Sequence, residues 1–277
     1  MVELDYLVIG HVTRDLVDGD FMIGGTASYA ARTARALGCR VGVITSARHD
    51  LDLSGVLDDV TITRFPAATT TTFENIYSAG GRSQVLHSIA ETLTPAMAPP
   101  DWRAKIVHLG PVARECDPAL VSTFGNAFVG LTPQGWMRSW DQAGRVSACQ
   151  WENAEPLLAR ADAVVLSDED VEGDEALVLR YAAQTRLLVV TQAAMGCTVH
   201  VAGQSRHFSA PAVPEVDPTG VGDIFAAAFF VRLQQDGNPW TAARFANCLA
   251  ARSVTRVGLS GTPGPEEVTR CGRGLEE

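Results

Sequence analysis

The sequence places two glycines and a carboxylate at the start of an apolar helix. Residues 215–233 read EVDPTGVGDIFAAAFFVRL, in which Gly220 and Gly222 precede the helical pattern and Asp223 opens it. Because the first N–H groups of a helix lack helical partners and lie at the positive end of its dipole, the amides of Gly220, Val221 and Gly222 would form an anion hole. A carboxylate there would repel a bound phosphate unless it had a chemical task. Beside a transferred phosphoryl group, Asp223 could accept the proton of an attacking alcohol.

Two other interpretations of this segment need to be compared with phosphoryl transfer. Asp223 could only cap the helix while the glycines serve a tight turn, and for Asp223 taken alone this alternative stays open. A dinucleotide-binding motif fits poorly, because the third glycine of G-x-G-x-x-G is missing and no acidic residue follows a strand about twenty residues later. The segment as a whole favours phosphoryl transfer.

Short apolar runs and helical patterns alternate along the chain and would position this segment. Runs typical of strands buried on both faces cover residues 6–9, 41–44, 105–109, 127–131, 163–166 and 187–190. Helical patterns cover residues 25–37, 174–184 and 223–235 and a fourth segment that starts at Asn238-Pro239. The alternation predicts one α/β domain whose mostly parallel sheet is covered on both faces.

One stretch interrupts the alternation. Residues 61–87 are rich in threonine and aromatic residues and contain a Gly80-Gly81 turn, which is typical of an antiparallel hairpin. Such an insertion could form a flap over one end of the sheet.

Charge and composition exclude several classes of protein. The 277 residues carry a formal net charge of −10 and no basic run, so we expect neither nucleic acid nor a membrane as partner. The chain has a single lysine, Lys105, which stands in neither a P-loop nor a protein-kinase motif. The N-terminus lacks a signal-peptide pattern and no run of about 18 apolar residues occurs, so we expect a cytoplasmic protein.

The cysteines show no pattern of a metal site or a disulfide framework. They are scattered, without a C-x-x-C pair, at Cys39, Cys116, Cys149, Cys197, Cys248 and Cys271. We expect them to be small core residues in a reducing compartment.

Four motifs, in order along the chain, resemble the ribokinase-like carbohydrate kinases, also called the PfkB family. DPTGVGD at residues 217–223 is similar to the family's C-terminal signature D-T-x-G-A-G-D, and GGTASYAARTARALG at 24–38 resembles its N-terminal glycine motif. GHVTRD at 10–15 follows the first strand, where the family places a substrate-binding aspartate, and residues 246–263 resemble its adenine-side helix and following loop. The resemblance implies a three-layer αβα sandwich of residues 1–277, with a small β lid from about 11–23 and 61–88.

The resemblance also implies a role for each matching residue. Asp223 would be the catalytic base, with Gly220, Val221 and Gly222 as the anion hole. The residues expected at the acceptor substrate are Asp15, Gly25, Thr26, Asn75, Gln134 and Arg138. Those expected at the nucleotide are Ser167, Thr191, Gly196 and Asn247. Asp170 would hold Mg²⁺ through water, and a monovalent cation would lie among Asp217, Thr219, Ser253, Gly258 and Thr262.

Several positions depart from the family pattern. The usual asparagine of the glycine motif is Tyr29, the N-x-x-E element appears as S-x-x-D from Ser167 to Asp170, and only the second glycine of G-x-x-G remains, as Gly196. Gln134 and Arg138 follow a strand end, where open α/β sheets bind ligands, although Arg138 could equally be a loop residue at the surface.

With a short first lid segment and LTPQGWMR at residues 131–138, the motifs look most like the myo-inositol kinase-like branch of the family. We therefore expect an ATP-dependent kinase, monomeric or homodimeric, that phosphorylates a hydroxyl of a sugar, a cyclitol such as myo-inositol, or a related polyol. Its cofactors would be Mg²⁺ and a monovalent cation such as K⁺. A nucleoside kinase of the same fold and a catalytically weak binding or regulatory protein are the alternatives.

Overall fold

A computed structural model describes residues 1–17, 19–78 and 81–273 of the chain. Within these residues the main sheet has nine strands in the order β15-β14-β13-β12-β9-β8-β1-β4-β5. Its strands are β1 (Val2–Ile9), β4 (Val41–Ala47), β5 (Thr61–Pro66), β8 (Trp102–Leu109), β9 (Phe128–Leu131), β12 (Ala163–Ser167), β13 (Leu187–Thr191), β14 (Cys197–Val201) and β15 (Gln204–Phe208). The pairings from β13 through β5 are parallel, and β14 and β15 are antiparallel to their neighbours.

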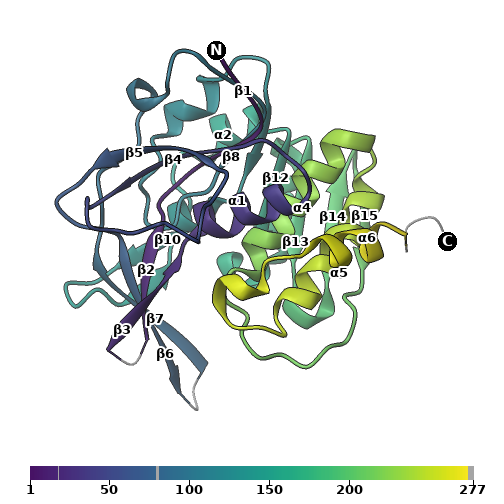
Figure 1. Cartoon of the computed structure of the whole chain (residues 1–277). Coiled ribbons are helices and arrows are strands. Elements are labelled where there is room, and N and C mark those ends of the chain that lie inside the picture. Colours follow the sequence, from purple (N-terminus) through teal and green to yellow (C-terminus); the bar gives the residue numbers. More distant parts are fainter. Residues whose placement is uncertain (18, 79–80, 274–277) are drawn as a thin grey trace.

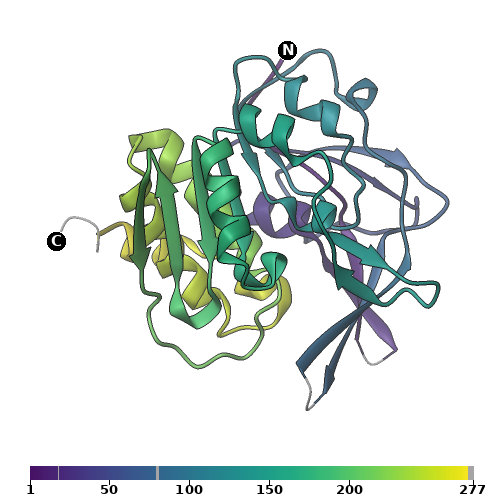
Figure 2. The same cartoon turned by 180° about the vertical axis from the view of Figure 1, so that it is seen from behind.

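Helices cover both faces of this sheet (Figures 1 and 2). They are α1 (Thr26–Ala36), α2 (Ala154–Arg160), α3 (Glu175–Gln184), α4 (Val221–Asp236), α5 (Pro239–Ser253) and α6 (Pro265–Arg273). Short 3₁₀ turns include η1 (Pro95–Met97), η2 (Pro118–Ser122), η3 (Pro133–Met137), η4 (Asp168–Val171), η5 (Ala193–Met195) and η6 (Gly258–Gly261).

The strands alternate between two hydrophobic cores. In β1, Tyr6 and Val8 pack into the core with α1, α4 and α5, whereas Leu7 and Ile9 pack into the core with α2 and α3. A strand whose two faces are both buried must be apolar at successive positions, which is why these strands read as continuous runs. The predicted α/β fold with three layers is therefore confirmed.

Helix α4 lies in the centre of one layer and is apolar around most of its circumference. Its residues from Ile224 to Val231 are buried, and it packs against both α1 and α5. Gly237, in the left-handed conformation, ends α4, and the Asn238 side chain then accepts N–H bonds from Trp240 and Thr241 to begin α5. The start of α4, where the anion hole is predicted, is thus held by a rigid, buried helix.

A separate four-stranded sheet, in the order β3-β2-β6-β7, projects from the main body (Figure 1). It consists of β2 (Thr13–Val17), β3 (Asp20–Gly24), β6 (Thr72–Ser78) and β7 (Gly81–Ser88), and a further pair is formed by β10 (Arg138–Trp140) and β11 (Val146–Ala148). β2 pairs with β3 in antiparallel and with β6 in parallel orientation.

The hairpin expected over residues 61–87 is shorter than predicted. Strand β5 belongs to the main sheet, parallel to β4, and only β6 and β7 form the antiparallel pair. As an edge strand β5 is half exposed and carries polar residues, so its sequence looks like that of a surface hairpin. Gly80 of the predicted turn lies outside the described residues.

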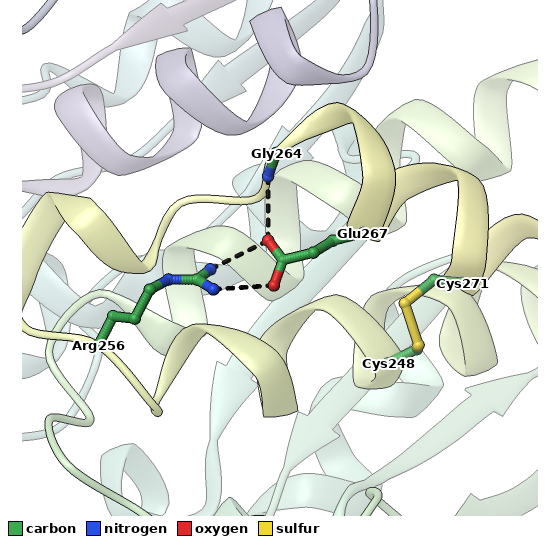
Figure 3. Close-up of a disulfide and its surroundings, with 5 residues drawn as sticks. All are labelled: Cys248, Arg256, Gly264, Glu267 and Cys271. Carbon is green, nitrogen blue, oxygen red and sulfur yellow. Dashed lines mark hydrogen bonds and ion pairs between the residues drawn. A yellow bond between two sulfur atoms is a disulfide. The ribbon is translucent and has the colours of Figure 1, made fainter.

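The expectation that all six cysteines are free was wrong. Cys248 in α5 and Cys271 in α6 form a disulfide, whereas Cys39, Cys116, Cys149 and Cys197 are free (Figure 3). The two partners are 23 positions apart, and only the packing of α6 on α5 brings them together. In the described part of the chain, no helix has the length and apolar character needed to cross a membrane.

Candidate active site

Many of the predicted site residues follow the carboxyl ends of parallel strands, where open α/β sheets bind ligands. Gln134 comes after β9, Asp170 after β12, and Thr191 ends β13. The start of α4 supplies the next group of residues.

The turn before α4 requires glycine. Gly220 has φ 77°, and a Cβ built there would lie 2.3 Å from Cδ1 of Tyr29. Gly222 is exposed, with open space where a side chain would be. No side chain caps this helix start among the residues described, and the Val221 N–H is directed at the Pro218 carbonyl at 3.2 Å. Tyr29, at the position where the resembling family has asparagine, is buried, and its ring lies directly against Gly220.

Asp223 lies in the first turn of α4 and is half-buried. Its Oδ1 accepts a hydrogen bond of 2.7 Å from the Thr26 hydroxyl. Burial raises the pKa of Asp223 to about 6; the Thr26 hydrogen bond and the charge of Arg138 lower it, whereas the charges of Asp15 and Asp170 raise it. A carboxylate with a pKa close to neutral pH is well suited to general base catalysis.

Asp170 forms a capping box with the end of β12. Its Oδ2 accepts the Ser167 N–H at 2.8 Å, while the Ser167 hydroxyl accepts the Glu169 N–H at 3.2 Å. Burial raises the pKa of Asp170, and hydrogen bonds from Ser167 and Gln134 and the charge of Arg138 lower it. The S-x-x-D element thus joins Ser167 to Asp170, and Gln134, after β9, bonds to the same Asp170 carboxyl.

The carboxylates fit Mg²⁺ held through water better than a closed metal cage. No group of three or more His, Cys, Asp or Glu side chains that could hold a metal occurs in the described part of the chain. Mg²⁺ usually keeps several waters and is held by one or two carboxylates together with substrate phosphates. Asp170 could serve as such a carboxylate.

Arg138 faces the carboxylates of the site. Its Nη1 donates to the Val112 carbonyl at 3.3 Å, and its guanidinium lies 5.9 Å from the centre of the Phe73 ring. Its charge lowers the pKa of both Asp170 and Asp223. An arginine in this place can neutralise a phosphate or bind a hydroxyl.

One face of the four-stranded sheet carries two of the polar residues predicted for the acceptor, Asp15 and Asn75. Asp15, 9% exposed, pairs in register with Phe73 and accepts a 2.9 Å hydrogen bond from the Thr13 hydroxyl. Asn75 lies two positions after Phe73, so it shares that face, and its Oδ1 accepts a 2.8 Å hydrogen bond from Gln84 on β7. Gln84 was not predicted from the sequence, although its position in the hairpin opposite Asn75 could have indicated it.

Gly25 lies between this face and α1. It has φ 84°, and a Cβ there would approach the His11 carbonyl oxygen to 2.4 Å. The backbone of the glycine motif therefore packs directly on the loop after β1.

The predicted monovalent-cation residues do come together, and the hydroxyls of Ser253 and Thr262 already form hydrogen bonds. Asp217 accepts N–H bonds from Thr219 at 2.9 Å and from Gly258 at 2.7 Å. The hydroxyls of Ser253 and Thr262 donate to the carbonyls of Ala250 and Leu259, and Arg32 donates to the Thr262 hydroxyl at 3.0 Å. Backbone carbonyls of this loop would supply further oxygen ligands to a cation.

The residues predicted for the nucleotide are less concentrated. Asn247 is 5% exposed, and its amide donates to the Phe208 carbonyl at 2.9 Å and to Sγ of Cys197 at 3.5 Å, which ties α5 to β14 and β15. Thr191 donates to the Leu166 carbonyl at 3.3 Å, and Gly196 has φ 99°. The Asn247 amide nitrogen thus has partners within the protein, and its predicted place at the nucleotide base stays a prediction.

A parallel sheet with a glycine turn, a helix start without a side-chain cap and a neighbouring half-buried carboxylate is typical of an α/β phosphotransferase. The pfkB family carbohydrate kinase profile matches residues 146–265. The chain is 31% identical over 223 residues to a fructokinase of Klebsiella pneumoniae, covering 73% of this chain and 71% of that enzyme. It is 30% identical over 252 residues to the cytidine kinase of Thermococcus kodakarensis, covering 82% and 87%. The chain belongs to the pfkB family of carbohydrate kinases and is a sugar or nucleoside kinase.

Solved structures show the same fold. A pyrophosphate-dependent kinase of the ribokinase family, in complex with a pyrophosphate analogue and myo-inositol, superimposes with a TM-score of 0.79 at 24% identity, over 95% of this chain and 99% of the other. The ribokinase of Thermotoga maritima gives 0.74 at 20% identity, over 98% and 99%.

Proposed function

We propose that this protein transfers the γ-phosphoryl group of ATP to a hydroxyl of a sugar, a cyclitol such as myo-inositol, or a related polyol. The observation that carries the proposal is the place of Asp223. It adjoins the glycine turn at one side and is within electrostatic reach of Asp15 on the acceptor face at the other. A base in this position can take the proton of a hydroxyl that attacks a phosphoryl group held at the start of α4.

The surrounding residues would divide the remaining work. Asp15, Asn75 and Gln84 would bind the other hydroxyls of the acceptor, since carboxylate and amide groups match vicinal hydroxyls. The amides at Gly220 and Gly222 and the dipole of α4 would hold the transferred group without any lysine. Mg²⁺ held by Asp170 through water would neutralise charge on the phosphates.

On the donor side, Ser167, Thr191 and Gly196 would line the path of the phosphates and nucleotide at the ends of β12 and β13. The loop around Asp217 and Gly258 would hold a monovalent cation through its carbonyl groups. The four-stranded sheet would act as the lid that closes over the acceptor.

A direct assay tests the proposal. The protein with Mg²⁺ is incubated with each pairing of two donors, ATP and pyrophosphate, and three acceptors, myo-inositol, fructose and cytidine, and the phosphorylated product is measured. We expect product from ATP with a polyol. Absence of transfer from every pairing, with ligand binding retained, would instead identify a binding or regulatory protein.

A nucleoside kinase is the second candidate, favoured by the likeness to the cytidine kinase of Thermococcus kodakarensis over 87% of that enzyme. Phosphorylation of cytidine with no turnover of either polyol would replace the first proposal by this one. Turnover with pyrophosphate alone would keep the acceptor and correct the donor.

A further inference from the structure

Thr26 makes a direct contact with the proposed base. It is the first residue of α1, is 2% exposed, and its hydroxyl donates to Oδ1 of Asp223 at 2.7 Å. The two residues are 197 positions apart in the sequence and meet because α1 packs against α4. The hydrogen bond occupies one carboxylate oxygen of Asp223 and leaves Oδ2 for another partner.

The methyl group of Thr26 has an equally defined environment. A Cβ at Gly110, just after β8, would lie 2.3 Å from Cγ2 of Thr26, so the methyl fills the space that this glycine leaves. The same Cβ position is 3.2 Å from Oγ1 of Thr132. The methyl of Thr26 is therefore closely packed against the Gly110 backbone, next to Thr132.

Thr132, next to Gly110, is held in place by a chain of hydrogen bonds. The Thr132 hydroxyl contacts Nε2 of His108 at 2.8 Å, and Nδ1 of His108 contacts the Tyr6 hydroxyl at 2.7 Å. Tyr6 and His108 are fully buried in the sheet and Thr132 nearly so. A buried, hydrogen-bonded chain of this kind resists displacement, because each lost bond would leave a buried polar group unsatisfied.

The two branches of a threonine are attached to one carbon. A constraint on the methyl therefore fixes χ1 and with it the direction of the hydroxyl. Contact with Gly110 on one side determines where the hydrogen bond to Asp223 forms on the other.

We propose that Thr26 is a positioning residue for the carboxylate of Asp223 and that Gly110 sets the rotamer of Thr26. This inference rests on the proposed function of Asp223 as base. The hydroxyl of Thr26 holds Oδ1, so that Oδ2 faces the acceptor hydroxyl. Thr26 thus acts through Asp223, in addition to any contact with substrate that the sequence suggests.

The first test replaces the hydroxyl of Thr26 without changing its shape. We expect Thr26→Val to lower kcat about 10- to 100-fold with the KM for the donor within about twofold, because a small misplacement of a reacting group is costly in rate. Thr26→Ser should recover most of kcat. Thr33→Val is the matched control, since the Thr33 hydroxyl is buried in the same helix and bonds the Tyr29 carbonyl; it should leave kcat unchanged.

The pH profile separates positioning from general stability. Loss of the Thr26 donor raises the pKa of Asp223, so the acidic limb of kcat/KM should move to higher pH in Thr26→Val and not in Thr33→Val. The other groups that face Asp223, namely Arg138, Asp15, Asp170 and the Tyr6 phenol, are the same in both variants.

The second test uses Gly110. Gly110→Ala should push the Thr26 methyl and lower kcat about tenfold or more. In Thr26→Ser the methyl is gone, so the alanine can occupy its place, and the double variant Gly110→Ala with Thr26→Ser should be faster than Gly110→Ala alone. Equal loss in the single and double variants would overturn the role of Gly110.

Failure of this inference differs from failure of the proposed function. A wild-type protein that transfers no phosphoryl group contradicts the proposed function. An active wild type whose kcat and pH profile are unchanged in Thr26→Val contradicts the positioning role alone.

Discussion

The proposed acceptor side and the proposed phosphate side of the site are built in different ways. On the acceptor side, side chains such as Asn75 and Gln84 project from a small sheet. The base of this sheet packs on the body through Phe73 and Leu86, whereas Phe21 and Ile76 further along are 41% and 42% exposed. On the phosphate side, backbone groups at the start of α4 and in the loop of Gly258 are held by buried helices and by a covalent bond.

Figure 3 shows how the phosphate side is braced. The disulfide Cys248–Cys271 joins α5 to α6, and between these cysteines Arg256 forms an ion pair of 2.9 Å with Glu267, whose carboxylate also accepts the Gly264 N–H. The loop thus closed contains the Gly258 amide that binds Asp217. Recognition of variable hydroxyls can use adaptable side chains, whereas binding of an invariant phosphate benefits from a rigid backbone.

The largest expected effect comes from the residue where the two sides meet. Asp223→Asn should lower kcat by about 10³-fold or more, because an amide cannot accept the proton of the acceptor hydroxyl. Donor binding should persist, since the amides of the α4 turn are unchanged. Steady-state kinetics and calorimetric titration with the donor measure the two quantities.

Near-normal kcat in Asp223→Asn would show that Asp223 has only a structural role, in the hydrogen bond that joins α4 to Thr26. Asp168→Asn is a suitable control, because Asp168 is an exposed carboxylate at the start of η4. It should leave turnover unchanged.

The next effect concerns the disulfide that joins α5 to α6 on the phosphate side. Replacing both Cys248 and Cys271 by serine should lower the free energy of unfolding by about 3 kcal/mol, the loss expected when a closed loop of this length is opened. Chemical denaturation measures this change, and a reductant should lower the Tm of the wild type to that of the double variant. The KM for the donor should rise while the KM for the acceptor stays within about twofold.

Cys39→Ser provides the matched control, since Cys39 is a free, half-exposed thiol in the same protein. Its Tm should fall with reductant as that of the wild type does, because the disulfide is still present, whereas the Tm of the Cys248→Ser, Cys271→Ser variant should be the same with and without reductant. A wild-type Tm insensitive to reductant would show that covalent closure does not distinguish the phosphate side.

The sequence predicted those parts of the fold that depend on local pattern. The buried strands and α1, α3, α4 and α5 follow from apolar runs and capping residues such as Asn238. β14 and β15 were not predicted, because β15 is an exposed edge strand with polar residues at most positions.

Only those parts of the candidate site that lie within one contiguous motif could be predicted from the sequence. Asp223 and its glycines lie in one segment, but the contact of Asp223 with Thr26 spans 197 positions. Gly110 has a role only because the folded chain places the Thr26 methyl where a Cβ at Gly110 would be. Cysteine pairing likewise depends on which helices pack together. The motif assigns Asn247 to the nucleotide, and this stays a prediction; that its amide also bonds β14 and β15 could not be read from the sequence, because it depends on how α5 packs.

A smaller effect tests whether the side chains of Gln84 and Asn75 bind the acceptor. Gln84→Leu should raise the KM for the acceptor about tenfold, because it removes one amide of the pair with Asn75 and leaves the other with an unsatisfied group. The KM for the donor should not change. Asn75→Leu should have a similar effect, and the two together should be less than additive because they act as a pair.

Glu74→Gln is the control for this pair. Glu74 is next to Asn75 on β6 but lies on the opposite face, where it contacts His87 at 2.8 Å. A rise of the acceptor KM in Glu74→Gln equal to that in Gln84→Leu would show that the whole sheet, rather than one of its faces, determines acceptor binding.

The smallest expected effect concerns the single lysine. Lys105 is 61% exposed and forms an ion pair of 2.9 Å with Asp5, whose pKa is lowered first by Arg40 and then by Lys105. Since Arg40 also contacts Asp5 at 3.0 Å, Lys105→Ala should cost less than about 1 kcal/mol of stability and leave kcat within about twofold. A loss of kcat/KM of tenfold or more, equal to about 1.4 kcal/mol of transition-state stabilisation, would mean that the phosphate side needs a lysine after all. The contrast between a backbone-built phosphate side and a side-chain-built acceptor side would then fail.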